Sequence, residues 1–395
     1  LAPLKKATYL RVVLKALPHS KSRSFKSINE SLGIKNKKAV QRDKGVGMRL
    51  KRLATALIIC IGGAVLTACT SVEQTKVETP PPSRYANASP LDLRLSTWPY
   101  PYPTKEFKTS LQGQPASMVY MDVPAVGKQK GVVVLFHGKN FSSDYWAPTI
   151  KGLTAAGYRV IAPDQIGFGK SSKPDVAYHF DDLARNTHAL LKSLGVSKTS
   201  VIANSMGGMV GIRFARLYPQ TVQKLVLENP LGLEDYSKDI PPQTNDNLLK
   251  LEMAQTETSY RRFLQSYFPV WQPSFEQFVE VYVRIQKGPD YPAYAKTSVL
   301  TYQMIAEKPV VNDLPQLKMP VLLVIGQKDR TVFGRRFAPP EAVKSLGNFP
   351  ELGRKAQAAI PNAKLVPIDN VGHVPHIEVP DYFVKTVVEF LNAKN

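Results

Sequence analysis

Short apolar runs recur along the chain in the way that buried strands do. Runs of this kind occupy 131–136, 158–164, 199–204, 224–228, 321–325 and 364–368. Residues 117–124 instead alternate apolar and polar side chains, which predicts an edge strand. Stretches with helical character separate most of these strands and cover 143–156, 180–194, 206–217 and 381–392. This alternation predicts an α/β fold with a doubly wound, mostly parallel sheet.

One long interruption breaks the alternation. Residues 231–315 are helical in character and rich in Tyr, Phe and Trp. A stretch of this length between two strands predicts a separate helical layer inserted into the fold. The core then consists of 96–230 and 316–395, and the insertion lies between them. Most of the aromatic side chains in the insertion are expected to pack against one another.

The stretch 199–210 joins a predicted strand directly to a predicted helix, with Ser205 at the turn. Ala203 and Gly207 stand two positions before and after the serine, where a very tight turn leaves no room for larger side chains. Backbone strain at such a turn is tolerated where it presents a hydroxyl to a base. An ordinary serine in a strand–helix turn is the alternative interpretation.

A serine hydroxyl becomes a good nucleophile only when a base takes its proton. His373 follows the last predicted strand, and Gly372 and Pro375 favour a sharp, stiff turn around it. The imidazole of His373 is therefore predicted at the carboxyl edge of the sheet. His376 is the nearest alternative base.

Two carboxylates follow predicted strands at the same edge and could orient the imidazole. Asp329 comes after the strand at 321–325, and Glu228 ends the strand at 224–228. We favour Asp329 and keep Glu228 as the alternative acid. Between Asp329 and His373 lies an extra loop and helix at 339–359, to which the sequence assigns no role.

Several segments resemble motifs of the α/β-hydrolase superfamily. Residues 203–207 resemble the G-x-S-x-G nucleophile elbow, with Ala203 in place of the first glycine, and the chain order Ser205, Asp329, His373 also matches. The His-Gly-Lys-Asn stretch at 137–140 resembles the oxyanion loop of this superfamily. Residues 164–171 resemble its D-x-x-G-x-G-x-S segment.

The resemblance implies a role for each matching residue. It makes Ser205 the nucleophile, His373 the base and Asp329 the residue that orients the base. The backbone N–H groups of Lys139 and Met206 are the expected oxyanion donors. The resemblance also makes His137 a structural residue of its loop, 164–171 a turn at the mouth of the pocket, and 231–315 a helical cap over the site.

The leading hypothesis for function is a serine hydrolase that cleaves carboxylic esters through an acyl-enzyme. The elbow also resembles hydrolases that cut carbon–carbon bonds in ring-cleavage products, and a lactonase could use the same triad. Epoxide hydrolases and haloalkane dehalogenases of this superfamily use an aspartate nucleophile, which Ser205 argues against. A ligand-binding relative without catalysis is the alternative from another class. A small ester-type molecule is the expected substrate, and no metal or organic cofactor is expected.

The formal net charge of +21 is unevenly distributed. Residues 1–47 carry twelve Lys and Arg against two acidic residues, which is +10, and Arg49, Lys51 and Arg52 add three more. Only +8 is left for the chain from Leu53 onward, so a nucleic-acid-binding face is not predicted. We expect 1–47 to be a non-native or disordered upstream segment. A genuine basic segment is the alternative.

Residues 48–68 have the layout of a secretory signal. A basic start at Met48 is followed by an apolar run to Leu66, which is short for a membrane span. The run ends in Leu-Thr-Ala-Cys, which resembles the bacterial lipobox and implies lipid modification of Cys69. A plain signal peptide or an uncleaved anchor is the alternative.

The rest of the N-terminal part follows from this interpretation. Residues 69–95 are rich in Pro, Ser, Thr and Asn and are predicted to form a flexible tether. Thr70 follows the cysteine, which resembles lipoproteins of the bacterial outer membrane, so the globular part is expected in the periplasm. A secreted or free periplasmic protein is the alternative. The only other cysteine is Cys60, so no disulfide framework is expected.

Overall fold

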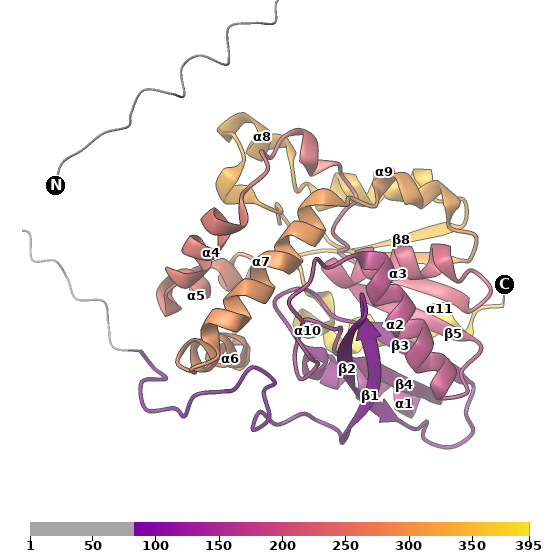
Figure 1. Ribbon diagram of the computed structural model, residues 1–395. Coiled ribbons are helices and arrows are strands. Elements are labelled where there is room, and N and C mark those ends of the chain that lie inside the picture. Colours follow the sequence, from indigo (N-terminus) through magenta and orange to yellow (C-terminus); the bar gives the residue numbers. More distant parts are fainter. Residues whose placement is uncertain (1–82, 395) are drawn as a thin grey trace, which may run out of the picture. The chain divides into compact units, whose positions relative to one another are not determined.

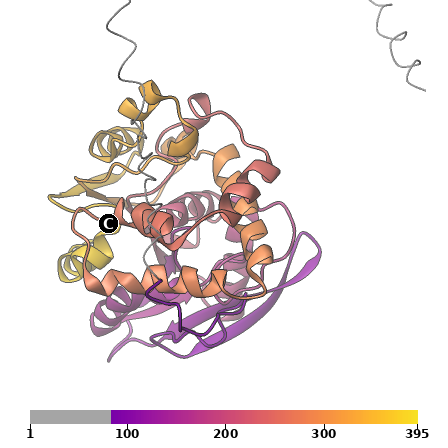
Figure 2. The same ribbon diagram turned by 90° about the vertical axis from the view of Figure 1, so that its left-hand side faces the viewer.

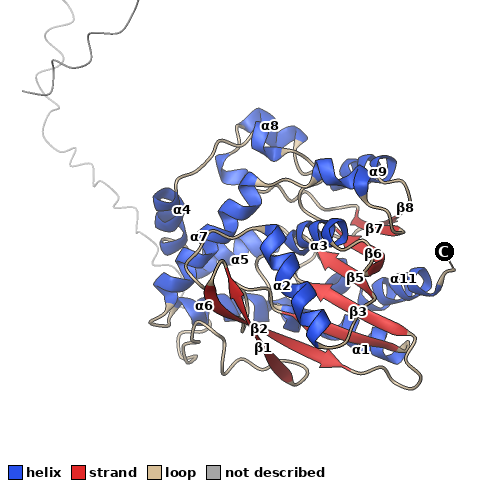
Figure 3. Cartoon of the chain, turned by 45° about the vertical axis from the view of Figure 1, so that its right-hand side comes forward, coloured by secondary structure: helices blue, strands red, loops and turns tan. Residues whose placement is uncertain are grey.

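The computed structural model describes residues 83–394. Eight strands form one sheet in the order β1-β2-β4-β3-β5-β6-β7-β8 (Figure 3). The strands are β1 (Thr104–Leu111), β2 (Gln114–Val123), β3 (Gly131–Phe136), β4 (Tyr158–Pro163), β5 (Thr199–Asn204), β6 (Val222–Glu228), β7 (Val321–Gly326) and β8 (Ala363–Ile368). The pairs β1–β2 and β2–β4 are antiparallel, and all others are parallel. The predicted α/β class with a mostly parallel sheet is confirmed.

Helices cover both faces of the sheet. One face carries α1 (Ala147–Ala155), which follows the short helix η1 (Ser143–Trp146), together with α11 (Pro380–Asn392). The other face carries α2 (Phe180–Ser193), α3 (Met206–Leu217) and α9 (Phe349–Ala359). Two short helices, α8 (Pro340–Ser345) and α10 (Pro375–Glu378), lie in connections. The layers match the doubly wound arrangement that the alternating pattern predicts.

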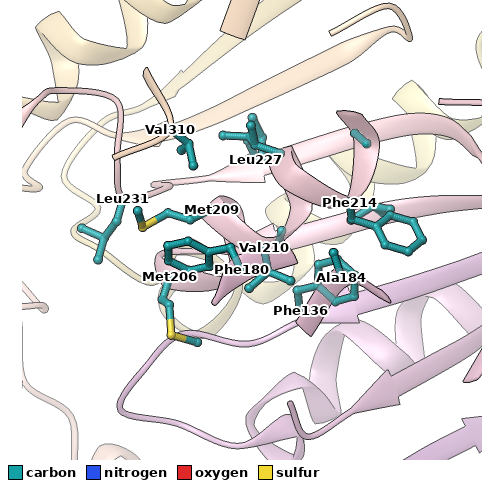
Figure 4. Packing of buried hydrophobic residues seen from close by; sticks show 14 of the residues in the cluster. Phe136, Phe180, Ala184, Met206, Met209, Val210, Phe214, Leu227, Leu231 and Val310 are labelled. Carbon is teal, nitrogen blue, oxygen red and sulfur yellow. The ribbon is translucent and has the colours of Figure 1, made fainter. Parts of the chain in front are cut away.

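Helix α3 is the best-buried helix of the core and begins directly after Ser205. Its Met206, Met209, Val210 and Phe214 are all fully buried, and Figure 4 shows them in the same cluster as Phe136 of β3. The rings of Phe136 and Phe214 meet edge to face, 5.7 Å apart. This packing holds the start of α3 rigidly against the sheet.

Strand β1 was not predicted, and it changes the place of its neighbour. The alternating stretch at 117–124 falls mostly within β2, which pairs with β1 on one side and with β4 on the other. The edge position therefore belongs to β1. Most side chains of β1 are exposed or half-buried, so the strand lacks the apolar run that marks the others.

Residues 339–359, which had no predicted role, are divided between two helices. Helix α8 lies in the connection after β7, whereas α9 packs on β7 and β8 through Phe349, Leu352 and Ala356. Gly353 lies so close to Ile325 of β7 that a Cβ there would be 2.9 Å from the isoleucine side chain. Helix α9 is thus the crossover helix between the last two parallel strands.

Four α-helices lie between β6 and β7, in the stretch where an inserted helical layer was expected. They are α4 (Asn245–Met253), α5 (Glu257–Gln265), α6 (Glu276–Gln286) and α7 (Tyr291–Glu307). Figure 1 shows them together at one end of the sheet, and in Figure 2 the same end faces the viewer. We call α4–α7 the cap.

Residues 83–103 precede β1 and pack against the folded domain. Leu91, Leu95 and Trp98 are almost completely buried among residues of the cap and the core. Within 83–95, the described part of the flexible tether expected over 69–95, the structure differs from that expectation because Leu91 and Leu95 are buried. We call 83–103 the strap, which is the indigo segment below α6 in Figure 1.

The expected signal peptide, its Cys69 and the rest of 1–82 lie outside the described residues. Within 83–394, no helix is both long and apolar enough to cross a membrane.

Candidate active site

Ser205 stands between β5 and α3 in a backbone conformation that few side chains adopt. Its φ is 56° and its ψ is −123°, as the tight turn in the sequence predicts. The Ser205 N–H donates to the carbonyl of Glu228 at 3.2 Å, and the Ser205 carbonyl accepts from Gly208 and Leu231. A Cβ at Gly207 would collide with the carbonyl oxygen of Phe136, so only glycine fits there. Surrounding contacts therefore hold the strained turn in place.

The structure brings Ser205, His373 and Asp329 together. Nε2 of His373 lies 2.9 Å from Oγ of Ser205, and Nδ1 lies 2.7 Å from Oδ2 of Asp329. All three residues are buried; Ser205 is 5% exposed. The sequence predicted this set from three residues that each follow a strand at the same edge of the sheet.

Two further contacts position the Asp329 carboxylate. Asn229 donates its side-chain N–H to Oδ2 at 2.6 Å, and the Thr331 backbone N–H donates to Oδ1 at 2.8 Å. The side-chain oxygen of Asn229 also accepts from the Gly326 N–H at 3.0 Å. Asn229 has a φ of 38°, an unusual value for a non-glycine residue. The sequence analysis missed Asn229, although its place directly after β6 is a signal that could have drawn attention to it.

Glu228 and His376, the two alternatives to Asp329 and His373, bind each other instead. Nδ1 of His376 lies 2.8 Å from Oε2 of Glu228, and the His376 N–H donates to Oε1 at 2.7 Å. Both side chains are fully buried. The His376 ring stacks on Trp146 with 3.8 Å between ring centres. This pair does not reach Ser205 and joins the end of β6 to α10.

The loop after β3 approaches Ser205 closely. A Cβ at Gly138 would lie 3.2 Å from the Cβ of Ser205. Nε2 of His137 accepts the Gln165 N–H at 3.0 Å, so Nδ1 carries the proton and donates to the Gly138 carbonyl at 2.9 Å. Burial lowers the pKa of His137, which favours this neutral form. His137 therefore holds its loop rather than acting on a substrate.

The two residues expected to supply oxyanion donors flank this approach. Lys139 follows Gly138 in the loop, and Met206 is the first residue of α3. The N–H of a first helical residue has no carbonyl acceptor within its own helix. Met206 directly follows Ser205, and Lys139 directly follows Gly138, which approaches Ser205; their role as oxyanion donors stays a prediction.

The Asp164 carboxylate organises the 164–171 segment. It accepts the N–H of Ser143 and of Lys170, each at 2.7 Å, and the hydroxyl of Tyr100 at 2.6 Å. Gly169 has a φ of 47° and leaves no space for a side chain beside the carboxylate. This segment is therefore a rigid turn, as its glycines predict.

A cap side chain covers the histidine. The ring of Tyr267 lies 4.6 Å from the ring of His373, and its carbonyl accepts the His373 N–H at 2.8 Å. The Tyr267 hydroxyl accepts a hydrogen bond of 2.9 Å from the side chain of Asn140 in the loop after β3. One tyrosine thus connects the cap to both the base and the expected oxyanion loop. The sequence did not indicate which aromatic residue of the insertion would do this.

A cavity of about 60 Å³ lies between the core, the cap and the strap. Its walls include Lys139, Asn140 and Phe141 from the loop after β3, so it begins beside the expected oxyanion site. Aromatic and aliphatic side chains from α5, α6 and α7 form much of the remaining wall. Ser205 and His373 are not among the lining residues, and the wall combines aromatic and aliphatic side chains with polar ones, which suits an organic molecule with an apolar group.

Two lysines, Lys139 and Lys173, are among the residues that line the cavity, and Lys139 is bonded to the cap. Nζ of Lys139 donates to Oγ of Ser298 at 3.1 Å, and that hydroxyl donates to Glu252 at 3.2 Å. Burial lowers the pKa of Lys139, and the negative charge of Glu252 opposes this effect. The charge of Lys139 is therefore balanced within the cap rather than by solvent.

Comparison with known proteins identifies the family. The alpha/beta hydrolase fold family matches residues 131–380, which is more than half of the chain. The chain therefore belongs to the alpha/beta hydrolase family.

Individual relatives are similar over most of the folded part. A solved structure of a probable hydrolytic enzyme from Pseudomonas aeruginosa PAO1 is 42% identical with a TM-score of 0.76, covering 78% of this chain and 99% of that one. Lipase 1 of Psychrobacter immobilis is 28% identical over 70% of this chain and 81% of its own length. A 2-hydroxy-6-oxo-6-(2'-aminophenyl)hexa-2,4-dienoic acid hydrolase of Metapseudomonas resinovorans is 27% identical over 66% and 84%.

Proposed function

We propose that this hydrolase cleaves carboxylic esters through an acyl-enzyme formed on Ser205. The observation that carries the proposal is the 2.9 Å contact between Oγ of Ser205 and Nε2 of His373, backed by the 2.7 Å contact of His373 with Asp329. This is the geometry in which a histidine can take the proton of a serine while a carboxylate holds its tautomer. The similarity to a lipase supports an ester as the substrate.

The proposed reaction has two halves. Oγ of Ser205 attacks the ester carbonyl carbon while Nε2 of His373 takes the hydroxyl proton. The negative oxygen of the tetrahedral intermediate accepts the N–H groups of Lys139 and Met206. His373 then gives its proton to the leaving alcohol. In the second half, His373 takes a proton from water as the water oxygen attacks the acyl carbon, and it then gives this proton to Oγ of Ser205 as the bond between Oγ and the acyl carbon breaks and the acid leaves.

Labelling with a fluorophosphonate tests the nucleophile. Attack by Ser205 displaces fluoride and leaves the phosphonate on Oγ, which peptide mass spectrometry locates. We expect one label, on Ser205, and a parallel loss of ester hydrolysis. Ser205→Ala should lose at least about 10³-fold in rate while keeping its fold. A folded Ser205→Ala protein that keeps more than a tenth of the activity would contradict the proposal.

A substrate panel separates the ester proposal from cleavage of a carbon–carbon bond. The similarity to a dienoic acid hydrolase favours this second candidate, because the same triad would serve it. The panel contains p-nitrophenyl esters, a lactone and a ring-cleavage dienoate. A higher kcat/KM for the dienoate than for every ester would favour carbon–carbon bond cleavage over the ester proposal. A higher kcat/KM for the lactone than for every ester would favour a lactonase. A protein that binds members of the panel without turnover would be a ligand-binding relative.

We further propose that Cys69 carries a lipid that holds the enzyme to a bacterial membrane, with the domain in the periplasm. The support is the basic start, apolar run and lipobox-like stretch at 48–69. Two or more acyl chains would give stable anchoring. Mass spectrometry of the mature N-terminus should find a modified Cys69, and Cys69→Ala should release or misprocess the enzyme without changing kcat. An unmodified N-terminal residue other than Cys69 would contradict this proposal.

A further inference from the structure

The strap, residues 83–103, is attached firmly to the cap. The Leu91 N–H donates to the carbonyl of Arg284, near the end of α6, at 2.9 Å. In the other direction, Nε of the Arg284 side chain donates to the Ser89 carbonyl at 2.8 Å. Nζ of Lys287 donates to the carbonyls of Tyr85 and Ala86 at 3.0 and 2.7 Å. A lysine and an arginine of the cap therefore bind the strap through its backbone.

The strap is also attached to the core. Nε1 of Trp98 donates to Asp144 at 2.9 Å, beside the loop after β3. Nε of Arg94 donates to the Lys170 carbonyl at 3.0 Å. The strap thus spans the junction between cap and core, and it does so from a stretch that precedes the family match at 131–380.

Three strap side chains, Leu93, Leu95 and Trp98, line the cavity. Leu95 is 3% exposed and has a φ of 52°, a left-handed conformation that costs a leucine energy. The contacts on either side of Leu95 hold it there. Leu91 is equally buried, at 1%, but is not among the residues that line the cavity.

We infer that the strap is part of the substrate site and that Leu95, with Leu93 beside it, limits the length of the apolar group that the cavity accepts. This inference takes the reaction at Ser205 from the proposed function and adds only which residues set the size of the cavity. Two strap leucines and side chains of α6 line a space that reaches Lys139 and Asn140, and these two residues directly follow Gly138, which approaches Ser205. An acyl or alcohol chain that enters from Ser205 would therefore meet the strap.

The test compares two leucines of the same strap. Leu95→Ala removes three carbon atoms from the cavity wall, whereas Leu91→Ala removes the same atoms from a buried site outside the cavity. For p-nitrophenyl esters from two to twelve acyl carbons, we expect Leu95→Ala to move the maximum of kcat/KM to longer chains by two or three carbons. Leu91→Ala should keep the wild-type maximum. Trp98 is less suitable because its removal also deprives Asp144 of a donor.

Leu93→Ala provides a second variant if Leu95→Ala does not fold. Leu93 is only half-buried, so its truncation should cost less stability and shift the maximum in the same direction by a smaller amount. The inference is wrong if the folded Leu93 or Leu95 variants keep the wild-type profile, or if Leu91→Ala shifts it equally. The same comparison can be made with alkyl fluorophosphonates of increasing chain length, by measuring the rate at which each one labels Ser205 in the wild type and in the variants.

The labelling experiment also separates the two ideas. If Ser205 reacts with no phosphonate of any length and no ester is cleaved, the proposed function has failed. If Ser205 reacts but the length profile ignores Leu93 and Leu95, only the role of the strap has failed.

Discussion

Two buried histidine–carboxylate pairs lie close together in this protein and differ in the contacts that Nε2 of each histidine makes. Nδ1 of His373 is 2.7 Å from Asp329, and Nδ1 of His376 is 2.8 Å from Glu228. Nε2 of His373 faces the hydroxyl of Ser205 at 2.9 Å. Nε2 of His376 has no hydrogen-bond partner among residues 83–394, and its ring is stacked on Trp146. The same two groups can therefore serve chemistry at one position and packing at the other.

The carboxylates differ in the same way. The Asp329 carboxylate accepts hydrogen bonds from the side chain of Asn229 and from the backbone N–H of Thr331. Its Oδ2 also contacts Nδ1 of His373. Both carboxylate oxygens of Glu228 bind His376, one through the imidazole ring and one through the backbone N–H of that histidine. The backbone carbonyl of Glu228 meanwhile holds the Ser205 N–H. The comparison teaches that a histidine next to an acid identifies a base only when its other nitrogen meets a reactive group.

Asp329→Asn should have the largest effect on catalysis. An amide in this place cannot stabilise the charged imidazole and favours the wrong tautomer, so kcat for ester cleavage should fall on the order of 10⁴-fold. Steady-state kinetics with a p-nitrophenyl ester measures the change, and circular dichroism checks the fold. A mild loss here, together with a severe one in Glu228→Gln, would exchange the roles of the two pairs.

Glu228→Gln should affect stability far more than kcat. The amide can keep only part of the contacts that the carboxylate makes with His376, so a buried group loses its partner. The expected cost is roughly 1–3 kcal/mol of unfolding free energy, with kcat changed by less than about tenfold. Urea unfolding and steady-state kinetics on the same sample measure both. A stable variant with a kcat as low as that of Asp329→Asn would contradict this division of roles.

The sequence predicted the parts of the site that follow strands of the parallel sheet. Ser205, Asp329 and His373 each come after a run of apolar residues, and parallel strands bring their carboxyl ends to one edge. The sequence could also rank Asp329 above Glu228, but it could not show that Glu228 binds His376. That contact joins residues 148 positions apart and depends on how α10 packs on Trp146.

Regions with weak local patterns were predicted less well. Strand β1 carries few apolar residues, so its pairing with β2 determines its structure more than its own composition does. The strap looks like a linker because Pro and polar residues dominate around Leu91 and Leu95. Its order comes from Arg284 and Lys287, almost 200 positions later in the chain. Contacts of this range leave no periodic signal in a sequence.

Tyr267→Phe should have a smaller effect than either of the two preceding changes. Tyr267 is the residue through which the cap covers His373. The variant keeps the ring beside His373 and loses only the hydrogen bond from Asn140. We expect kcat/KM to fall by a factor of about 2 to 10, which corresponds to one hydrogen bond of about 0.5–1.5 kcal/mol. Tyr236→Phe is the matched control, because its hydroxyl bonds to the Ile305 carbonyl in α7 instead. Equal losses in the two variants would mean that the cap, rather than this contact, is responsible.

The smallest expected effect concerns Glu378, whose carboxylate lies near both pairs. It accepts the N–H groups of Gly372 and Val374, the two neighbours of His373. Burial raises the pKa of Glu378 to about 7, and the negative charges of Asp329 and Glu228 act in the same direction. A carboxyl group with a raised pKa binds its proton more tightly in the folded state than in the unfolded one.

The sign of the pH dependence follows from this difference. The contribution of Glu378 to stability is fully present below its unfolded pKa of about 4.5 and is lost as pH rises through about 7. Glu378→Gln cannot titrate, so its unfolding free energy should change less than that of the wild type between pH 5 and pH 8. Urea unfolding at the two pH values measures this, and Glu389→Gln on the exposed face of α11 controls for the lost charge. A Glu378→Gln protein with the wild-type pH dependence would show that titration of Glu378 does not contribute to the change of stability between pH 5 and pH 8.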